Sequence, residues 1–306
     1  MGNPLVSVVL CSYNGAAHIA QQIDSILEQN WKPLELIISD DNSTDGTKQV
    51  LSRYEHHPGV QVFYQPVNTG LARNFAFAAK QARGEMIAFA DQDDIWLSGK
   101  IEALVDSRGN YPLVYSDSLL VDEYGNSLHK RLSDLRKMYT GEDSRGYILY
   151  SCVWGHGMLV TRALLERSYP MPPGIHHDIW LAFMAFLNGG IKYHDQVLTH
   201  YRQHGRSSSI TLPQPQGSRD QKQRYNDYAK KLEWIRLMQQ NERPVYQPFY
   251  KKLLKLYSKK RDGKYVFPLL NFMLKNRKSI FMFSKKGFLS QLVEILKQAR
   301  GIDAKF

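Results

Sequence analysis

The feature that most restricts the fold of this chain is a regular alternation of strand-like and helix-like segments near its start. Apolar, β-rich runs predict strands, and segments with apolar residues at helical spacing predict the helices between them. The predicted strands are 5–13, 34–40, 60–65 and 85–90, and the predicted helices are 16–29, 43–54 and 71–82. Strands joined in this way by short connections form parallel sheets with right-handed crossovers. The pattern therefore predicts an α/β fold with a mostly parallel, doubly wound sheet.

A polar cluster follows each of these strands. The clusters are "SYNG" (12–15), "DDNSTDG" (40–46), "PVNTG" (66–70) and "DQDD" (91–94). In doubly wound sheets, ligands bind beyond the carboxyl ends of the strands. The sequence therefore predicts that these four clusters meet in one binding site.

The "DQDD" cluster is suited to a divalent cation. Asp91 and Asp93 are two carboxylates at one strand end, and Mg²⁺ or Mn²⁺ prefers such oxygen ligands. A bound cation would offset the repulsion between the carboxylates and attract a diphosphate. The alternative is a solvated acidic turn or a helix N-cap.

The other clusters offer groups for a nucleotide. Tyr13 could stack on a base, and Asp41 could accept a hydrogen bond from a pyrimidine imide N–H. Arg73 could pair with a phosphate or a carboxylate. Taken singly, each residue also has an ordinary structural explanation. Tyr13 fits a simple turn, Asp41 a turn that caps the next helix, and Arg73 an exposed surface position.

Composition indicates a protein that folds in water. The chain has 306 residues, 43% of them hydrophobic, and contains no apolar run of the length that spans a membrane. We read no signal peptide, and we expect Cys11 and Cys152 to be buried thiols in a reducing compartment. A cytoplasmic location follows as an expectation.

The charge changes sign along the chain. Residues 1–218 carry 18 Lys and Arg against 22 Asp and Glu, whereas residues 219–306 carry 22 against 7. We therefore expect two domains, at 1–218 and at 219–306, the second basic and mainly helical.

Four motifs in register resemble the N-terminal half of glycosyltransferase family 2. They are "VSVVLCSYNG", "LELIISDDNSTDGT", "NTGLARNFA" and "GEMIAFADQDDIW". The later "HHDIWLAF" and "YRQHG" look like a rhamnosyltransferase-like branch of bacterial O-antigen and capsule synthesis. The resemblance extends to about residue 206 and leaves the basic region uncovered.

The resemblance implies a GT-A fold, a dTDP- or UDP-sugar donor, Mn²⁺ or Mg²⁺, and inversion at the anomeric carbon. It also divides the first domain into a nucleotide-sugar-binding half (1–110) and an acceptor-binding half (111–218). Residues implied to bind the nucleotide sugar are Ser12, Tyr13, Asn14, Asp41, Arg73, Asp91, Gln92 and Arg202. Those implied to bind metal are Asp91, Asp93 and His204.

An inverting transfer needs a carboxylate to remove the proton of the acceptor hydroxyl. Asp178 in "HHDIWL" resembles the family's base, although His177 stands where relatives commonly have Glu. A helix N-cap is the alternative role of Asp178. The residues that the resemblance places near the acceptor are Trp154, Gly155, His156 and Asp94.

We therefore expect a hexosyltransferase that adds a sugar, first of all rhamnose, to a bacterial surface glycan or its lipid-linked precursor. The alternative donors are UDP-hexoses. The alternative to an enzyme is a catalytically inactive protein that binds nucleotide sugars. We expect the segment 219–306 to dock on the anionic inner face of the membrane. Nucleic-acid binding and a solvated helical surface are rival explanations of its charge, and no nucleic-acid module is visible.

Overall fold

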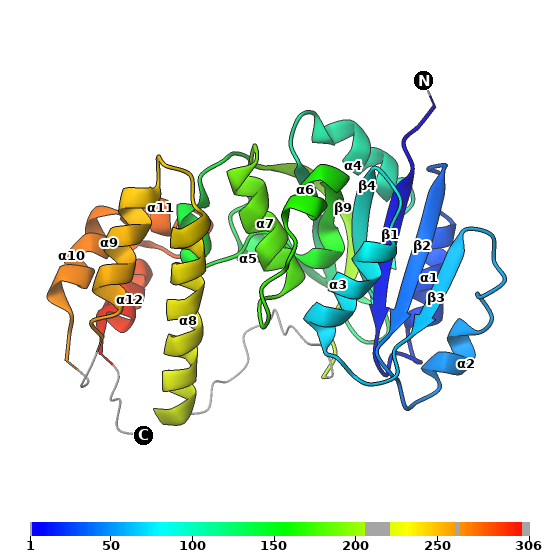
Figure 1. The fold of residues 1–306 in the computed structure, drawn as a ribbon, viewed down its shortest axis with the longest axis horizontal. Helices are drawn as coiled ribbons and strands as arrows, with labels where there is room; N and C mark the ends of the chain where they lie inside the picture. Colours follow the sequence, from blue (N-terminus) through cyan, green and yellow to red (C-terminus); the bar gives the residue numbers. More distant parts are fainter. Residues whose placement is uncertain (1, 206–220, 261–263, 302–306) are drawn as a thin grey trace. The chain divides into compact units, whose positions relative to one another are not determined.

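The computed structural model describes residues 2–205, 221–260 and 264–301 (Figure 1). The chain divides into two compact units, Met1–Glu142 with Cys152–Thr211, and Asp143–Ser151 with Leu212–Phe306. The boundary predicted at residue 218 lies outside the described residues. The sequence did not predict that a short internal segment, 143–151, belongs with the C-terminal unit.

The first unit contains one mixed sheet with helices on its two faces (Figure 1). The strands are β1 (Val6–Ser12), β2 (Leu34–Asp40), β3 (Val60–Tyr64), β4 (Met86–Asp91), β5 (Ile95–Trp96), β6 (Leu113–Val121), β7 (Ser127–Arg131), β8 (Met158–Thr161) and β9 (Ile191–Arg202). The helices are α1 (Ile19–Leu27), α2 (Thr47–Leu51), α3 (Leu71–Gln81), α4 (Lys100–Arg108), α5 (Leu132–Leu135), α6 (Arg162–Arg167) and α7 (His177–Leu187), with the short 3-10 helix η2 (Gly155–Gly157).

The strand order is β3-β2-β1-β4-β8-β6-β9-β5, with β7 paired to β6. The first four strands along the chain are mutually parallel, as predicted. β8 then enters antiparallel between β4 and β6, and β6 runs parallel to β9. This order brings the end of β4 close to segments that lie far along the chain.

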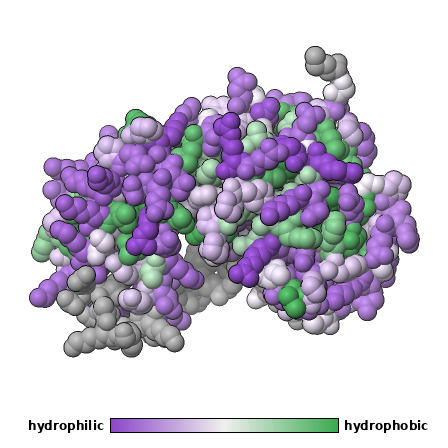
Figure 2. All heavy atoms as spheres, viewed as in Figure 1, coloured by the Kyte–Doolittle hydropathy of each residue, from purple (hydrophilic) through white to green (hydrophobic). Residues whose placement is uncertain are grey.

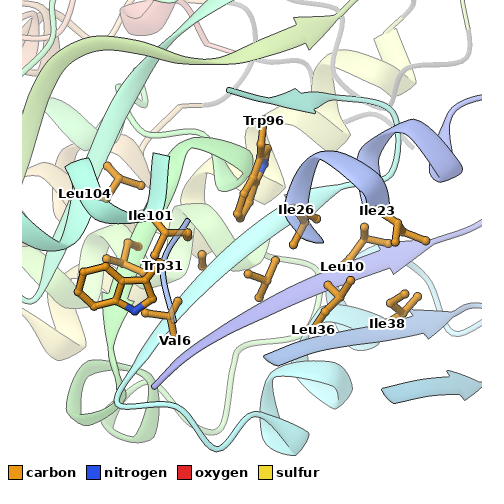
Figure 3. Packing of buried hydrophobic residues seen from close by; sticks show 14 of the residues in the cluster. Val6, Leu10, Ile23, Ile26, Trp31, Leu36, Ile38, Trp96, Ile101 and Leu104 are labelled. Atoms are coloured by element: carbon orange, nitrogen blue, oxygen red, sulfur yellow. The ribbon is translucent and has the colours of Figure 1, made fainter. Parts of the chain in front are cut away.

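The main core packs α1 and α4 against one face of the sheet (Figure 3). Alternate residues of β1, among them Val6 and Leu10, meet Ile23 and Ile26 of α1. Burying an isoleucine or leucine side chain contributes roughly 1.5–3 kcal/mol to stability. The helical spacing of the α1 apolar residues thus fixes α1 beside the loop that follows β1.

The second unit is helical. It consists of the 3-10 helix η1 (Ser144–Ile148) with α8 (Gln221–Asn241), α9 (Gln247–Tyr257), α10 (Phe267–Lys275), α11 (Arg277–Ile280) and α12 (Phe288–Ala299). Segment 143–151 is held there by polar contacts, because Ser144 Oγ donates to Glu242 Oε2 at 2.6 Å and Trp234 Nε1 donates to Tyr147 O at 3.3 Å.

The viewed surface is mostly hydrophilic, with hydrophobic residues in small patches (Figure 2). Among the described residues, no helix combines the length and the apolar character needed to cross a bilayer.

Candidate active site

The loop after β1 is fixed to the loop after β4 by one side chain. Gln92 accepts from Tyr13 N at 2.9 Å and donates to Tyr13 O at 3.1 Å. Gly15 lies directly beneath it, since a Cβ at this position would be 2.1 Å from Gln92 Oε1. The Tyr13 side chain itself is 47% exposed and available for stacking. Gln92, predicted to bind the donor, therefore also positions the predicted stacking residue.

Ser12 and Asn14 connect the first loop to the second. Ser12 Oγ donates to Asp40 Oδ1 at 3.0 Å, and Asn14 Oδ1 accepts from Thr44 N at 2.8 Å. Asn14 has a left-handed backbone with φ of 50°, a conformation that asparagine tolerates better than most residues. Both predicted residues thus fix the shape of the site, and contact with a nucleotide stays a prediction.

Asp41 holds the loop before α3. Its Oδ1 accepts from Thr69 N at 2.8 Å and from Thr69 Oγ1 at 2.9 Å, while Oδ2 accepts from Gly70 N at 2.8 Å. The residue is only 3% exposed, so an approaching base would have to share these oxygens. Arg73, in the first turn of α3, is exposed.

An acidic cluster with one histidine forms at the end of β4. His156 Nδ1, on η2, lies 3.7 Å from Asp91 Oδ2 and 3.6 Å from Asp94 Oδ2. The ligand atoms of the three residues lie within 4.8 Å of one another, as a shared cation would require. On the other side of the ring, His156 Nε2 lies 2.9 Å from Ser118 Oγ. Because Ser118 engages Nε2, Nδ1 is left facing the carboxylates.

Asp94 is the fully buried member of this cluster. Burial raises the pKa of its carboxyl well above the usual range, and the nearby charges of Asp93 and Asp91 raise it further. Oδ1 accepts from Arg202 N at 3.0 Å, but Oδ2 has no hydrogen-bond partner among the residues that the structure describes. A buried carboxylate oxygen without a donor is costly, and it is the atom that a cation would satisfy.

Lys100, for which the sequence predicts no role, lies next to His156 of this cluster. Its ammonium donates to His156 O at 2.6 Å and to Thr199 Oγ1 at 2.7 Å, and it lies 3.9 Å from the Trp96 ring centroid. Burial lowers its pKa to about 7, against the opposing effect of Asp94. Lys100 therefore fixes the backbone of η2 through His156.

Asp93 and His204 form a second, more accessible pair. His204 Nε2 lies 2.8 Å from Asp93 Oδ2, and both side chains are partly exposed. The His204 ring also lies 5.5 Å from the ring of His18, whose pKa is lowered by burial and by the charges of Arg202 and His204. The structure thus brings together two of the three predicted metal ligands, close in sequence to the third, Asp91.

Arg202 is buried, and its guanidinium is occupied by protein oxygens. Nε donates to Asp93 O at 2.7 Å, one terminal nitrogen to Glu123 O at 2.8 Å and the other to Gln21 Oε1 at 2.8 Å. The predicted contact with a diphosphate would require some of these bonds to break. In this structure Arg202 instead holds the acidic turn in place.

Asp178 lies in the first turn of α7, where Ile179 N donates to its Oδ1 at 2.8 Å. The N-terminus of a helix carries partial positive charge, which attracts a carboxylate at this position. A Cβ on Gly155 would lie 3.6 Å from Asp178 Cβ and 2.8 Å from His177 Nε2. The segment Trp154–His156 therefore joins the candidate base to the acidic cluster, with half-buried Trp154 at its edge.

Comparison with known proteins identifies the family. The model of glycosyl transferase family 2 matches residues 7–168, more than half of the chain. The chain belongs to glycosyl transferase family 2. It is therefore a glycosyltransferase, and both the family and the enzyme class predicted from the motifs are confirmed.

Curated glycosyltransferases resemble part of the chain. An uncharacterised glycosyltransferase of Nostoc sp. is 28% identical over 67% of this chain and 67% of its own length. The putative teichuronic acid biosynthesis glycosyltransferase TuaG of Bacillus subtilis is 35% identical over 40% of this chain. The Escherichia coli enzyme WfgD, named as a UDP-Glc:alpha-D-GlcNAc-diphosphoundecaprenol beta-1,3-glucosyltransferase, is 30% identical over 39%. The matches span 52% of TuaG and 51% of WfgD, about half of each.

Two solved structures share the fold of this glycosyltransferase. S. aureus TarS 1–349 in complex with UDP-GlcNAc matches 98% of this chain and 82% of its own, with a TM-score of 0.60 and 17% identity. The mannosyltransferase PcManGT of Pyrobaculum calidifontis, in complex with GDP-Man and Mn²⁺, matches 97% of this chain and 86% of its own, with a TM-score of 0.55 and 18% identity. The predicted GT-A fold with a helical C-terminal part is confirmed.

Proposed function

We propose that this glycosyltransferase moves one sugar from a nucleoside diphosphate donor to a bacterial surface glycan or its lipid-linked precursor, with inversion at the anomeric carbon. The observation that carries the proposal is the convergence of an acidic cluster and a helix-start carboxylate, joined by Trp154–His156. TarS and PcManGT were crystallised with nucleotide sugars, and TuaG and WfgD are named for polysaccharide or lipid-linked glycan synthesis, which supports both substrate classes.

The residues present fit a divalent cation. Carboxylates and one imidazole are suitable ligands for Mn²⁺, and the unpartnered Asp94 Oδ2 shows a local excess of acceptors. A cation that also meets the donor needs ligands within reach of solvent. We therefore assign the site to Asp91, Asp93 and His204, with Asp94 and His156 supporting it from the buried side. When bound, the cation would stabilise negative charge on the departing diphosphate.

The protein's own residues perform the remaining tasks. Tyr13 stacks on the base, and Asp41 and Arg73 contact the donor from the second strand end and from α3. Asp178 accepts the proton of the acceptor hydroxyl, and its negative charge also favours an oxocarbenium-like transition state. Trp154 and the adjoining backbone of η2 bind the acceptor.

For the donor we keep two candidates. The motifs "HHDIWLAF" and "YRQHG" support dTDP-rhamnose, whereas the likeness to WfgD supports UDP-glucose. Calorimetric titration with dTDP and with UDP separates them, because the preferred nucleotide should bind more tightly in the presence of Mn²⁺.

The same titration tests the metal ligands. Asp93→Asn should abolish the Mn²⁺-dependent part of nucleotide binding, whereas Asp94→Asn should retain it. The reverse result would move the cation to the buried cluster of Asp91, Asp94 and His156. If neither nucleotide binds the wild-type protein, the proposed donor site is wrong.

Asp178→Asn tests the base. Transfer should fall by roughly a hundredfold or more, while nucleotide binding stays unchanged, because a general base typically contributes this much. Asp106→Asn, on an exposed position of α4, is the matched control. Wild-type transfer rates in Asp178→Asn would exclude Asp178 as the base.

A further inference from the structure

Helix α12 presents an apolar stripe to solvent. Leu289, Val293 and Leu296 recur at spacings of four and three residues and are 76%, 51% and 43% exposed. This spacing places them on one face of the helix. Ile295 and Ala299 lie on the buried side, so the stripe is not part of the core of the helical unit.

Two further exposed aromatic side chains lie near the two ends of α12. At its start, Phe288 is exposed, and the Arg277 guanidinium carbon lies 4.8 Å from its ring centroid. At its end, Val266 N donates to Ala299 O at 2.9 Å, which brings the beginning of α10 alongside. Phe267, 71% exposed, is the first residue of α10. We call Phe267, Phe288, Leu289, Val293 and Leu296 the apolar face.

Positive charge surrounds the apolar face. Lys285 and Lys286 lie just before Gly287, the N-cap of α12, and Lys297 and Arg300 lie at the end of the helix, all exposed. From Arg243 to Arg300 the sequence has 15 Lys and Arg but only two acidic residues. Of these two, Glu294 is the one described, and it pairs with Lys286 at 3.2 Å.

We propose that the apolar face docks into the headgroup region of an anionic lipid bilayer. An amphipathic helix with lysines flanking a leucine-rich face lies in the membrane interface, and each nearby Lys or Arg adds about 1 kcal/mol of attraction. A nucleic acid would match the charge but leave the exposed leucines in water. A second copy of the chain would bring two basic rims together.

The sequence alone predicts membrane contact for the whole of residues 219–306, whereas the structure points to five side chains within it. This inference goes beyond the proposed reaction, and its readout does not require sugar transfer. A failure of docking and a failure of the proposed activity are therefore separate results.

The test is sedimentation of the full chain with vesicles of phosphatidylcholine alone and of phosphatidylcholine mixed with phosphatidylglycerol. Binding is expected only to the anionic vesicles and should weaken as salt rises. The double variant Leu289→Ser/Val293→Ser should reduce the partition coefficient about tenfold or more, because two side chains lose their burial in lipid. Both positions are exposed, so the fold should tolerate the change, which a circular dichroism melt checks.

The matched control is Val245→Ser, at a 70% exposed valine of the same unit that is not in the apolar face. It should bind anionic vesicles as the wild type does. Any of the following results would overturn the proposal: no binding to anionic vesicles, equal binding by the double variant, or an apolar face that is buried in a dimer which the double variant separates. Loss of duplex DNA binding, rather than vesicle binding, in the double variant would also overturn it.

Discussion

Replacing His177 with leucine should make the catalytic unit less sensitive to acid. The His177 ring is buried, with its centroid 3.9 Å from that of Phe75 and 4.9 Å from that of Phe89, and within the described part of the chain neither ring nitrogen has a hydrogen-bond partner. Burial lowers its pKa to about 4 from an ordinary value of 6.5, although the charge of Asp178 opposes the shift. The folded protein therefore holds His177 neutral over a range in which the unfolded chain binds a proton.

The sign follows from that difference. Between pH 6.5 and pH 4 the unfolded state binds more protons at this site, so the free energy of unfolding falls as the pH falls. Each pH unit costs about 1.4 kcal/mol, and the full range about 3 kcal/mol. Above pH 6.5 the contribution of His177 does not change.

Urea unfolding followed by fluorescence at pH 7.5, 6, 5 and 4.5 measures this dependence. The free energy of unfolding of His177→Leu should fall less steeply with decreasing pH than that of the wild type, by about 2–3 kcal/mol over the whole series. The comparison uses slopes, so a constant effect of the leucine itself does not matter. His56→Leu, at an exposed histidine, should keep the wild-type slope. An unchanged slope in His177→Leu would refute the reasoning.

Three further substitutions test the polar framework. Lys100→Met should lower the free energy of unfolding by about 1–3 kcal/mol for each of the two buried acceptors, His156 O and Thr199 Oγ1, that lose their donor, and a wild-type melting temperature would contradict this. Gly15→Ala should weaken nucleotide binding in calorimetry, because its Cβ would displace the Gln92 side chain that holds the Tyr13 backbone, and wild-type affinity would contradict this. Ser118→Ala frees His156 to turn, so it should leave Mn²⁺ binding unchanged if the cation lies at Asp91, Asp93 and His204, whereas a loss of about tenfold would place the cation in the buried cluster that contains His156.

The sequence was sufficient to predict the parallel half of the sheet. Each strand there is an apolar run followed by a polar cluster. The apolar run predicts the strand, and the polar cluster predicts where the site residues lie. The family motifs then selected Asp91, Asp93 and His204, of which the last two meet at 2.8 Å although 111 residues separate them.

The antiparallel half was not predictable in this way. The insertion of β8 between β4 and β6 is a long-range pairing without a local signal. It places His156 against Asp91 and Asp94, although the sequence analysis had assigned His156 to the acceptor. The segment "LSGKIEALV" that follows "DQDDIW" gives no local signal that Lys100 is buried. Its contact with His156 O depends on the insertion of β8, and its contact with Thr199 depends on the pairing of β9 with β5 and β6. The contacts of Arg202 likewise depend on a long-range pairing, that of β9 with β6, and could not be predicted from the sequence.

The chain enters the helical unit twice, first through 143–151 and then after the catalytic unit ends. A fragment cut near residue 218 would therefore keep Tyr147 and Ile148 while losing the helices that bury them. The helical unit cannot be replaced by exchanging residues after 218 alone, because segment 143–151 of this unit lies between two segments of the catalytic unit. The internal segment 143–151 ends at Ser151, three residues before Trp154. The backbone that leads to the predicted acceptor segment therefore starts within the helical unit. A partner or surface that binds the helices of this unit is therefore connected, through a few residues of backbone, to the segment where we expect the acceptor sugar to bind.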